Sequence, residues 1–360
     1  MIERDDLDVE NPGIQQEKLE AAFDLLKQIE AVDKRHGYDR VVRPLRLREK
    51  RLRVWRWVAA CAAIVCPLIV GEIWLTERSI DDIPLVKTDS IVPGMSKARL
   101  VLGDKKEVLL DTLSTRDLLV DAGITIRKEG KGVIYESRQQ AGEKDPVYNE
   151  LIVPRGGEYD VILEDGTHVW LNADSKLKYP AVFTGKQRRV YLEGEGYFDV
   201  AKDSIRPFLV ETREQNIQVL GTAFNVYAYF GEQMNYTTLV RGKVSVRDKR
   251  GGKQWILHPG QQVCMDVTNE ECVVREVDVR KEIAWKDGLF VFHGQTLEQI
   301  MTKLARWYDI TVFFQSEEAK SLLFKGNLPR YSDFQIMLNV LEKSSNVQFN
   351  VKDRVVTVSI

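Results

Sequence analysis

Hydrophobic residues follow three different spacings along the chain, and each spacing predicts a different structure. Residues 57–75 are apolar except for Glu72, and at ~1.5 Å rise per residue they would cross the roughly 30 Å hydrocarbon core of a bilayer. From residue 97 onward, short alternating runs predict β-strands. Near the N-terminus the spacing is three or four, as on one face of an amphipathic helix: Leu19, Ala22, Phe23, Leu26 and Ile29.

Charged residues are distributed unequally around the apolar segment. Basic residues crowd its N-terminal side, whereas acids prevail after it. The positive-inside rule therefore puts residues 1–53 in the cytoplasm and the longer C-terminal part outside. A buried core helix would not explain the one-sided charge, and a signal peptide would begin earlier. The basic flank consists of Arg48, Lys50, Arg51, Arg53 and Arg56.

The predicted N-terminal helix cannot bury its apolar stripe against itself. It needs a second copy, the membrane surface or another protein. Its polar face mixes acids with bases, which favours a protein partner over anionic lipid. A weakly ordered stalk is the alternative.

The region after residue 97 predicts a mainly-β domain, either a sandwich or a rolled sheet. Residues 98–111 and 159–172 resemble each other, and each predicts a hairpin, the second with a turn at Asp165 and Gly166. Glycines predict the corners: Gly194, Gly196, Gly221, Gly242 and Gly260. Further strands are expected at 190–192, 197–200, 208–211, 217–220, 223–229, 237–240, 243–247, 255–258 and 261–266.

The last segment predicts an α+β domain built from two copies of a β–loop–α–β unit, after a linker at 277–286. Thr296 with Gln299, and Ser332 with Gln335, predict capping boxes at the starts of two helices. The first helix carries an apolar stripe at Leu297, Ile300, Met301, Leu304 and Tyr308, and the second at Phe334, Met337, Leu338 and Leu341.

Composition and motifs argue against an enzyme or a nucleic-acid-binding protein. The net charge is −2, and the four histidines are scattered without metal-ligand spacing. No nucleophile, phosphate-loop or cofactor motif is present, so no cofactor is expected. Glu193, Glu195 and Asp199 alternate along a strand edge, which indicates that this edge is solvated and is not an acid/base pair.

Two cysteines, Cys264 and Cys272, flank a predicted turn. They are either a cross-strand disulfide or two small buried side chains.

Several stretches resemble the FecR domain of membrane-bound anti-sigma regulators: VPRGGEYDVILEDGTHVWLNADSKLKYP (153–180), RRVYLEGEGYFDVAKD (188–203), VLGTAFNVYAY (219–229) and TTLVRGKVSV (237–246). The stretches AWKDGLFVFHGQTLEQIMTKLARWYDITVFF (284–314) and FKGNLPRYSDFQIMLNVL (324–341) are similar to the C-terminal domain that accompanies it. That domain resembles the signalling domain of TonB-dependent transporters. The expected order is a cytoplasmic sigma-binding arm (1–53), a transmembrane helix (54–75), a periplasmic linker (76–96), a FecR-like β domain (97–276) and an α+β domain (277–360).

The resemblance implies a signal relay across the inner membrane, with the N-terminus in the cytoplasm and the C-terminus in the periplasm. A loaded outer-membrane TonB-dependent transporter would engage the periplasmic domains through its signalling domain. The arm, with Leu19, Phe23, Leu26 and Ile29 as contact candidates, would control a sigma factor of the extracytoplasmic-function class. The implied output is transcription of transport genes, without direct contact to nucleic acid.

Two forms of cleavage follow as hypotheses. Pro67 and Gly71 weaken the predicted span where an intramembrane or other envelope protease would act, although both residues are ordinary in membrane helices. Some relatives carry Gly-Thr in a similar strand and split there, by attack of the threonine hydroxyl on the glycine carbonyl. Gly221 and Thr222 are the matching pair here; a corner glycine before a strand threonine is the alternative.

The rival function is a membrane-tethered periplasmic module that binds a ligand such as a glycan. Aromatic residues near turns favour it, because sugars stack on rings: Trp170, Tyr179, Tyr197, Tyr227 and Tyr229. Alternation places several of these in the core instead.

Overall fold

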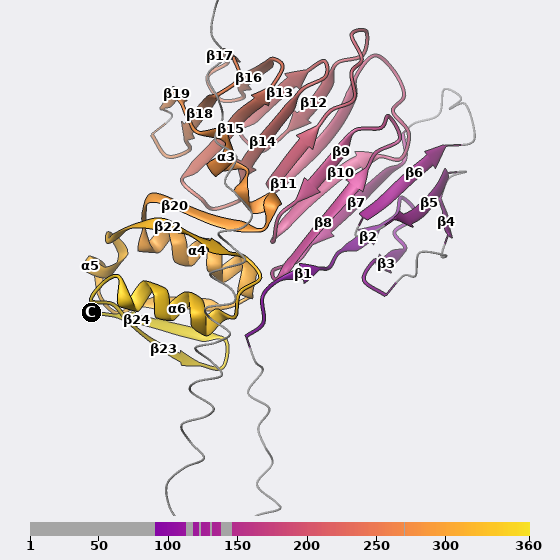
Figure 1. Cartoon of the computed structure of the whole chain (residues 1–360). Helices are drawn as coiled ribbons and strands as arrows, with labels where there is room; N and C mark the ends of the chain where they lie inside the picture. The colour runs from indigo at the N-terminus through magenta and orange to yellow at the C-terminus, as the bar shows by residue number, and fades with distance from the viewer. Residues whose placement is uncertain (1–90, 113–117, 122–123, 130–131, 138–145, 270) are drawn as a thin grey trace, which may run out of the picture. The chain divides into compact units, whose positions relative to one another are not determined.

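The computed structural model describes residues 91–360 except 113–117, 122–123, 130–131, 138–145 and 270. The predicted arm and the apolar segment 57–75 lie outside the described residues. Within the described part of the chain, no helix has the length and apolarity needed to span a bilayer. Two folded parts follow one another: a β part with strands β1–β19 and an α+β part that begins at residue 289 (Figure 1).

The β part consists of two sheets, as the mainly-β pattern predicts. The first runs in the order β3-β2-β7-β10-β11-β12-β13-β16-β17. Its strands are β2 (Arg99–Val101), β3 (Glu107–Leu109), β7 (Tyr148–Val153), β10 (Ser175–Pro180), β11 (Arg188–Asp199), β12 (Phe208–Glu211), β13 (Gln215–Val219), β16 (Val244–Asp248) and β17 (Gln254–Leu257).

The second sheet runs in the order β4-β5-β6-β8-β9-β11-β14-β15-β18-β19. The short β1 (Met95–Ser96) pairs in parallel with β8. The other strands are β4 (Leu118–Asp121), β5 (Ile124–Glu129), β6 (Gly132–Ser137), β8 (Gly157–Ile162), β9 (His168–Leu171), β14 (Ala223–Ala228), β15 (Met234–Arg241), β18 (Gln261–Asp266) and β19 (Cys272–Glu276).

Strand β11 belongs to both sheets. Its first half pairs with β10 and β12, and its second half pairs with β9 and β14. The change occurs at Gly194, whose φ of +105° lies in a region that favours glycine. The prediction of two separate strands, 190–192 and 197–200, was therefore wrong. Gly194 is a corner as predicted, but Gly196 lies within the strand, opposite Leu171 and Val226.

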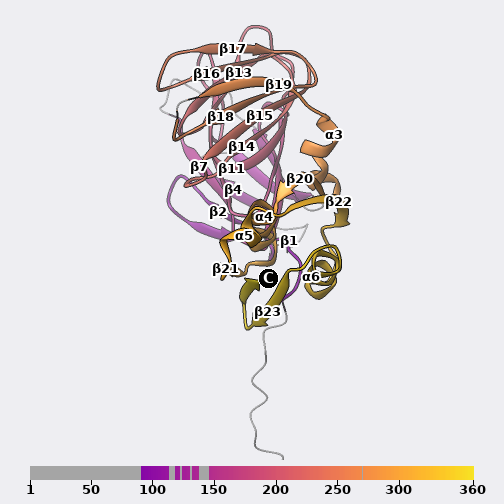
Figure 2. The same cartoon turned by 90° about the vertical axis from the view of Figure 1, so that its left-hand side faces the viewer.

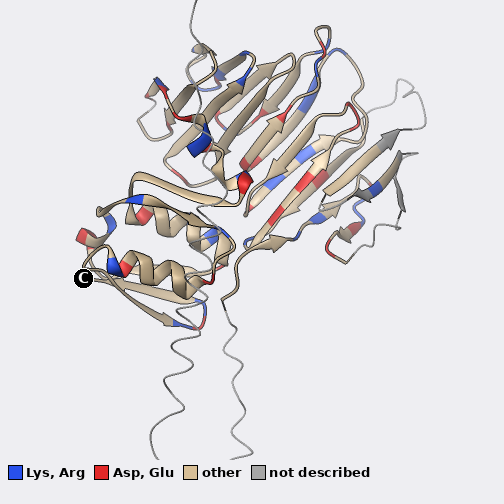
Figure 3. Ribbon diagram, in the orientation of Figure 1, with Lys and Arg blue, Asp and Glu red and all other residues tan. Residues whose placement is uncertain are grey.

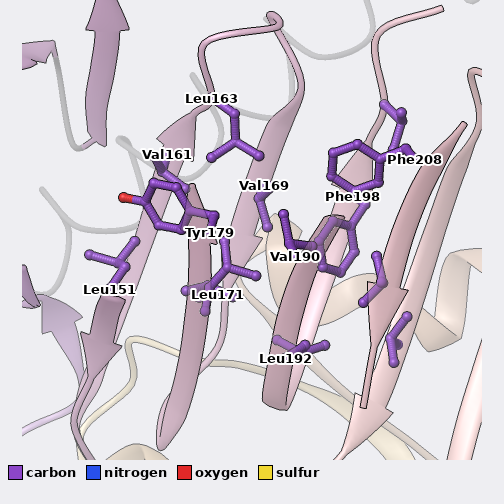
Figure 4. Close-up of a cluster of buried hydrophobic side chains, with 14 of the residues drawn as sticks. Leu151, Val161, Leu163, Val169, Leu171, Tyr179, Val190, Leu192, Phe198 and Phe208 are labelled. Carbon is purple, nitrogen blue, oxygen red and sulfur yellow. The ribbon is translucent and has the colours of Figure 1, made fainter. Parts of the chain in front are cut away.

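The core lies between the two sheets, because alternate side chains of each face inward. Leu151 and Tyr179 come from the first sheet, and Val161 and Leu171 from the second (Figure 4). Phe198 of the shared strand stacks on Phe224, with ring centroids 5.2 Å apart. The alternating pattern of the sequence thus specifies which face of each strand is buried.

Both predicted hairpins are present. Strand β2 pairs with β3, and β8 pairs with β9. In the second hairpin Gly166 has a φ of +83°, which fits the predicted turn. The Asp165 side chain fixes this turn by accepting from the Thr167 backbone N–H and from the buried guanidinium of Arg188, at 3.0 and 2.7 Å.

The two cysteines of the β part are free. In the pairing of β18 with β19, Cys264 lies opposite Val273, and Cys272 lies opposite Met265. The one-residue offset puts the two thiols on opposite faces of the sheet, because neighbouring positions alternate. The disulfide alternative was therefore wrong. Cys264 is buried, and Cys272 is half-buried.

The α+β part has two longer helices, α4 (Leu297–Tyr308) and α6 (Phe334–Lys343), between two small sheets, and a short helix, α5 (Glu317–Lys320) (Figure 1). One sheet pairs β20 (Leu289–Thr296) with β22 (Leu323–Pro329), and the other has the order β21-β24-β23. The remaining elements are β21 (Thr311–Phe314), β23 (Gln348–Lys352) and β24 (Val355–Ser359).

The two helices bury the apolar stripes that their sequences predict. All five predicted positions of α4 and all four of α6 are buried. Thr296 and Gln299 form the predicted capping box. The second box was wrong: Asp333, one residue after Ser332, caps α6 by accepting from the Gln335 N–H at 2.8 Å. A carboxylate at the helix N-terminus also interacts favourably with the helix dipole.

The segment between the two parts is ordered and packed, unlike the linker predicted at 277–286. It contains α3 (Val279–Glu282) and a 3-10 helix, η1 (Ala284–Asp287). Figure 2 shows α3 beside the sheet of β15 and β18, and Glu282 accepts from Gln262 there. Trp285 of η1 packs with Tyr197 and Ala223 of the β part. The prediction of a linker was wrong because the burial of a single residue, Trp285, fixes this segment, and one residue gives no alternating pattern.

Candidate functional site

A closed ring of hydrogen bonds joins five residues from both folded parts. Glu195 accepts from the side-chain amides of Asn172 and Asn225, at 2.7 and 3.0 Å between nitrogen and oxygen. The Trp285 indole N–H donates to Asn225 Oδ1 at 3.2 Å. Arg330 closes the ring by donating to the Trp285 carbonyl at 2.9 Å and to Asn172 Oδ1 at 2.7 Å. We call these five residues the junction ring.

Backbone structure positions the three β-part members of the ring. Asn172 follows β9, Glu195 lies in β11, and Asn225 lies in β14. These three strands are neighbours, so their side chains meet on one side of the second sheet. The Glu195 backbone N–H donates to Ser175 Oγ at 2.9 Å, which fixes the strand directly after its change of sheet.

Glu195 is buried, which contradicts the predicted solvated edge. Only 7% of the residue is exposed, whereas the side chains of Glu193 and Asp199 are 54% and 42% exposed. Simple alternation puts Glu193 and Glu195 on the same side. The left-handed backbone of Gly194 lies between them and breaks that alternation. A glycine between two acids was the available signal, and it was interpreted only as a turn.

Burial and pairing set the charges of the ring. Burial raises the pKa of Glu195, and the amides of Asn172 and Asn225 together with the charges of Lys303 and Arg330 oppose this in part. Burial lowers the pKa of Arg330, which is 1% exposed. The Arg330 guanidinium lies 3.9 Å from the carboxylate of Glu158. The ring therefore holds an acid and a base apart, with neutral amides and a carbonyl between them.

Trp307 supports the ring from the α+β part. Its indole ring is 1% exposed and lies 3.7 Å from the Arg330 guanidinium, measured to the ring centroid. Its Nε1–H donates to the Arg330 carbonyl at 2.6 Å. Tyr331 meets the same indole edge-on and donates through its hydroxyl to Glu158 Oε1 at 2.6 Å. A desolvated cation–π contact of this kind contributes about 2 kcal/mol.

The C-terminal end of α4 is bound by the turn between β7 and β8. Arg155 of this turn donates to the backbone carbonyls of Ala305 and Ile310, and its Nε lies 3.3 Å from Asp309 Oδ1. A cation at this end of a helix satisfies free carbonyls and the helix dipole. The sequence indicated Arg155 only as part of a turn, because its partners lie about 150 residues further along the chain.

Arg306 of α4 makes a second contact with the β part. Its guanidinium lies 3.7 Å from the Tyr229 ring centroid, pairs with Glu232 and donates to the Tyr227 hydroxyl at 3.3 Å. Tyr229 in turn donates to the Ala173 carbonyl at 2.8 Å. Arg155 of the β part and Arg306 of α4 thus both hold the C-terminal end of this helix against the β part.

A cavity of about 50 Å³ lies at the junction ring. Glu195, Trp285, Lys303 and Arg330 are among its lining residues. This volume holds a few water molecules, whereas sites for drug-sized ligands have about 300–1,000 Å³. The junction ring is therefore better suited to holding the two parts together than to binding a metabolite.

The aromatic residues proposed for a glycan site pack against one another. Tyr179 and Tyr229 are buried, and Trp170 stacks on His168 with centroids 3.6 Å apart. Trp170 also meets Tyr197 edge-on, and Tyr227 meets Tyr229. These contacts occupy the ring faces that a sugar would need.

The other predicted site residues are not brought to the junction ring. Gly221 has a φ of +151°, and a Cβ there would approach Lys202 Cα to 2.8 Å. Thr222 is buried, and its hydroxyl donates to the Lys243 carbonyl at 3.0 Å, an acceptor that cannot take up its proton. Self-cleavage at this bond stays a prediction. The remaining candidates lie outside the described residues: Leu19, Phe23, Leu26, Ile29, Arg48, Lys50, Arg51, Arg53 and Arg56.

The raised pKa of Glu195 predicts how stability depends on pH. Above the ordinary value of 4.5, and up to its raised folded value, the folded protein binds more protons than the unfolded chain. Its free energy of unfolding therefore falls as pH rises through this interval. Glu195→Gln is expected to remove this slope. Urea unfolding of the full-length chain across the acidic range measures it, and Glu193→Gln, at an exposed position, should keep the wild-type slope. Identical slopes for the wild type and Glu195→Gln would contradict the assignment.

Comparison with protein-family models assigns most of these residues to two known domains. Residues 149–245 match the model of the FecR protein family, and residues 289–358 match that of the FecR C-terminal domain. The chain belongs to the FecR family. In this FecR-family chain, Asn172, Glu195 and Asn225 fall in the FecR match, and Arg330 falls in the C-terminal match. Trp285 lies between the two, so the junction ring connects both domains of the family.

Solved structures agree with the family assignment. Two crystal structures of a candidate anti-sigma factor from Parabacteroides distasonis ATCC 8503, at 1.65 and 2.50 Å resolution, are similar to the FecR-family chain. Each has a TM-score of 0.55 and 29% sequence identity, and 98% of that protein is covered by 58% or 59% of this chain. A comparison with curated proteins gave no match.

Proposed function

We propose that the chain is an anti-sigma factor that relays a signal from an outer-membrane TonB-dependent transporter to a sigma factor of the extracytoplasmic-function class. The observation that carries this proposal is the order of a FecR domain and a FecR C-terminal domain after a basic-flanked apolar segment. The similar solved structures, described as those of a candidate anti-sigma factor, support the same role.

The N-terminal arm is the proposed sigma-binding element. Its apolar stripe needs a partner, and a helix laid in a groove is a common mode of protein recognition. Residues 57–75 are the proposed single span of the inner membrane. This places the arm beside the sigma factor and both folded parts in the periplasm.

The α+β part is the proposed contact for the transporter's signalling domain. Its three-stranded sheet ends on both sides in strands with a free edge among the described residues, β21 and β23. Four of the five residues of β23 are exposed, and an open hollow of about 730 Å³ lies over β23 and β24. Such an edge can accept a further strand from a partner. Acidic and basic residues are intermixed over the described ribbon (Figure 3), which fits a protein partner.

The proposal predicts that the full-length chain captures a sigma factor from the cells that make it. Phe23→Asp or Leu26→Asp puts a charge into the apolar stripe, where burying it without a partner is costly. Affinity purification of the tagged chain, followed by mass spectrometry, should show at least about a tenfold loss of the sigma factor for these variants.

Gln28→Asp is the matched control, because it adds the same charge on the predicted polar face. It should retain the sigma factor. Absence of any sigma factor in the wild-type sample, together with unchanged transcription after deletion of the gene, would refute the proposal and favour a tethered binding module.

A further inference from the structure

The first six described residues, 91–96, lie between the two folded parts, and we call them the strap. Ile91 packs against the core of the α+β part. Met95 and Ser96 form β1 and pair with Gly157 and Glu158 of β8 in the β part (Figure 1). Two backbone bonds fix this pairing, from Met95 N to Gly156 O at 3.1 Å and from Lys97 N to Glu158 O at 3.2 Å. The strap therefore contacts both parts within a few residues.

Gly94 lies directly against the indole ring of Trp307. A Cβ at this position would lie 2.5 Å from Cε3 of Trp307, closer than a Cβ approaches a non-bonded atom in folded proteins. The indole ring cannot simply turn away, because its Nε1–H bonds the Arg330 carbonyl and the Arg330 guanidinium covers it. Gly94 is thus matched to the position of a side chain that also supports the junction ring.

Gly156 links the strap to helix α4 through its own backbone. Its carbonyl accepts from Met95, and its N–H donates to the Arg306 carbonyl at 2.7 Å. Its φ of +68° lies in the left-handed region that favours glycine. Arg155, the preceding residue, binds the end of the same helix. Any shift of α4 away from this turn therefore acts on the turn that holds the strap.

We propose that the strap is a mechanical link: it stays bound to the β part only while the C-terminal end of α4 is docked, and its release reports displacement of the α+β part. Two contacts carry this coupling: Gly94 with Trp307 of the α+β part, and Met95 with Gly156 of the β part. The link deepens the proposed relay and rests on it for its role in signalling. The coupling itself is a property of this chain alone and requires no partner.

Hydrogen–deuterium exchange of the full-length chain in detergent micelles tests the link. In Gly94→Val the new side chain overlaps the Trp307 ring. Exchange in peptides covering 91–98 should rise by about tenfold or more, and exchange in peptides covering 305–310 should rise with it, because coupling between two sites is reciprocal. Met95→Val puts the same side chain at the next position. Met95 binds Gly156 through its backbone N–H, which the substitution keeps, and the residue is 56% exposed, so this variant should change neither region.

Arg155→Gln tests the link from the other side. It removes the cation at the end of α4, so exchange at 305–310 should rise as a direct effect. Exchange at 91–98 should rise as well, because the turn that holds the strap is no longer bound to the helix. Peptides over β13 and β16 report whether the β part remains folded. If Gly94→Val unfolds that part, Arg155→Gln decides the question alone. The proposal is overturned if either variant changes only its own region while the β part stays folded. Because no sigma factor or transporter is present, this outcome is separate from failure of the proposed function.

Discussion

Trp307→Ala is expected to lower the free energy of unfolding by about 3–5 kcal/mol, the usual cost of truncating a buried tryptophan. The residue is 1% exposed and contacts Arg330, Tyr331 and the strap. The truncation would leave a cavity, and the buried guanidinium of Arg330 would lose the aromatic ring that it lies against. Against a typical stability of about 5–15 kcal/mol, this loss is large enough to unfold the α+β part under mild denaturant. Urea unfolding of the full-length chain, followed by circular dichroism, measures it.

Trp255→Ala is the matched control for this truncation. Trp255 lies in β17 and is only partly buried against the edge of the main core. Its loss should cost about 1 kcal/mol, within the usual range for single substitutions. Equal effects of the two truncations would mean that Trp307 fills space without organising the junction.

Arg330→Met is expected to cost about 3–5 kcal/mol, because it removes one charge of a buried network and leaves the others uncompensated. The Trp285 carbonyl loses a donor, Asn172 Oδ1 loses its bond to the guanidinium, and Glu195 loses a nearby cation. Methionine preserves most of the volume, so the effect reports on the charge and the hydrogen bonds. The same unfolding measurement, at neutral pH, checks this value.

Two further variants separate charge from geometry. Arg330→Lys keeps the charge but cannot donate to two acceptors while lying flat on an indole, so it should recover only part of the loss. Adding Glu195→Gln to Arg330→Met should restore part of the stability relative to Arg330→Met alone, because the buried acid that loses its nearby cation is then neutral. A double variant that is simply additive would show that Glu195 and Arg330 do not interact.

Local patterns predicted the elements whose signals lie within a few residues. The stripes of α4 and α6 follow the helical period, and both helices begin where a capping side chain stands. The helix cap at Asp333, where Ser332 was predicted, shows how far local patterns reach. Both of these adjacent residues are able to cap a helix, and only the path of the backbone selects one of them. Strand β10 was missed although Leu177 and Tyr179 alternate with lysines, a pattern that predicts a half-buried strand.

The junction ring could not be predicted because its members are distant in the sequence. Asn172 and Arg330 are 158 positions apart, and no local spacing connects them. Trp285 lay in a predicted linker, and Glu195 was placed on the wrong face because of Gly194. Buried polar residues of this kind are specified by the whole fold. Sequence patterns find them only where a left-handed glycine or an isolated tryptophan interrupts an otherwise regular segment.

Strand β11 affects the order in which the parts of the protein unfold. Because one continuous backbone belongs to both sheets, neither sheet can lose β11 without disturbing the other. Both layers should therefore melt together as one cooperative unit. The α+β part has its own core and is attached mainly through the contacts of the junction ring, Arg155 and Arg306. We expect it to open first and reversibly, leaving the two-sheet unit as a rigid platform that survives each opening.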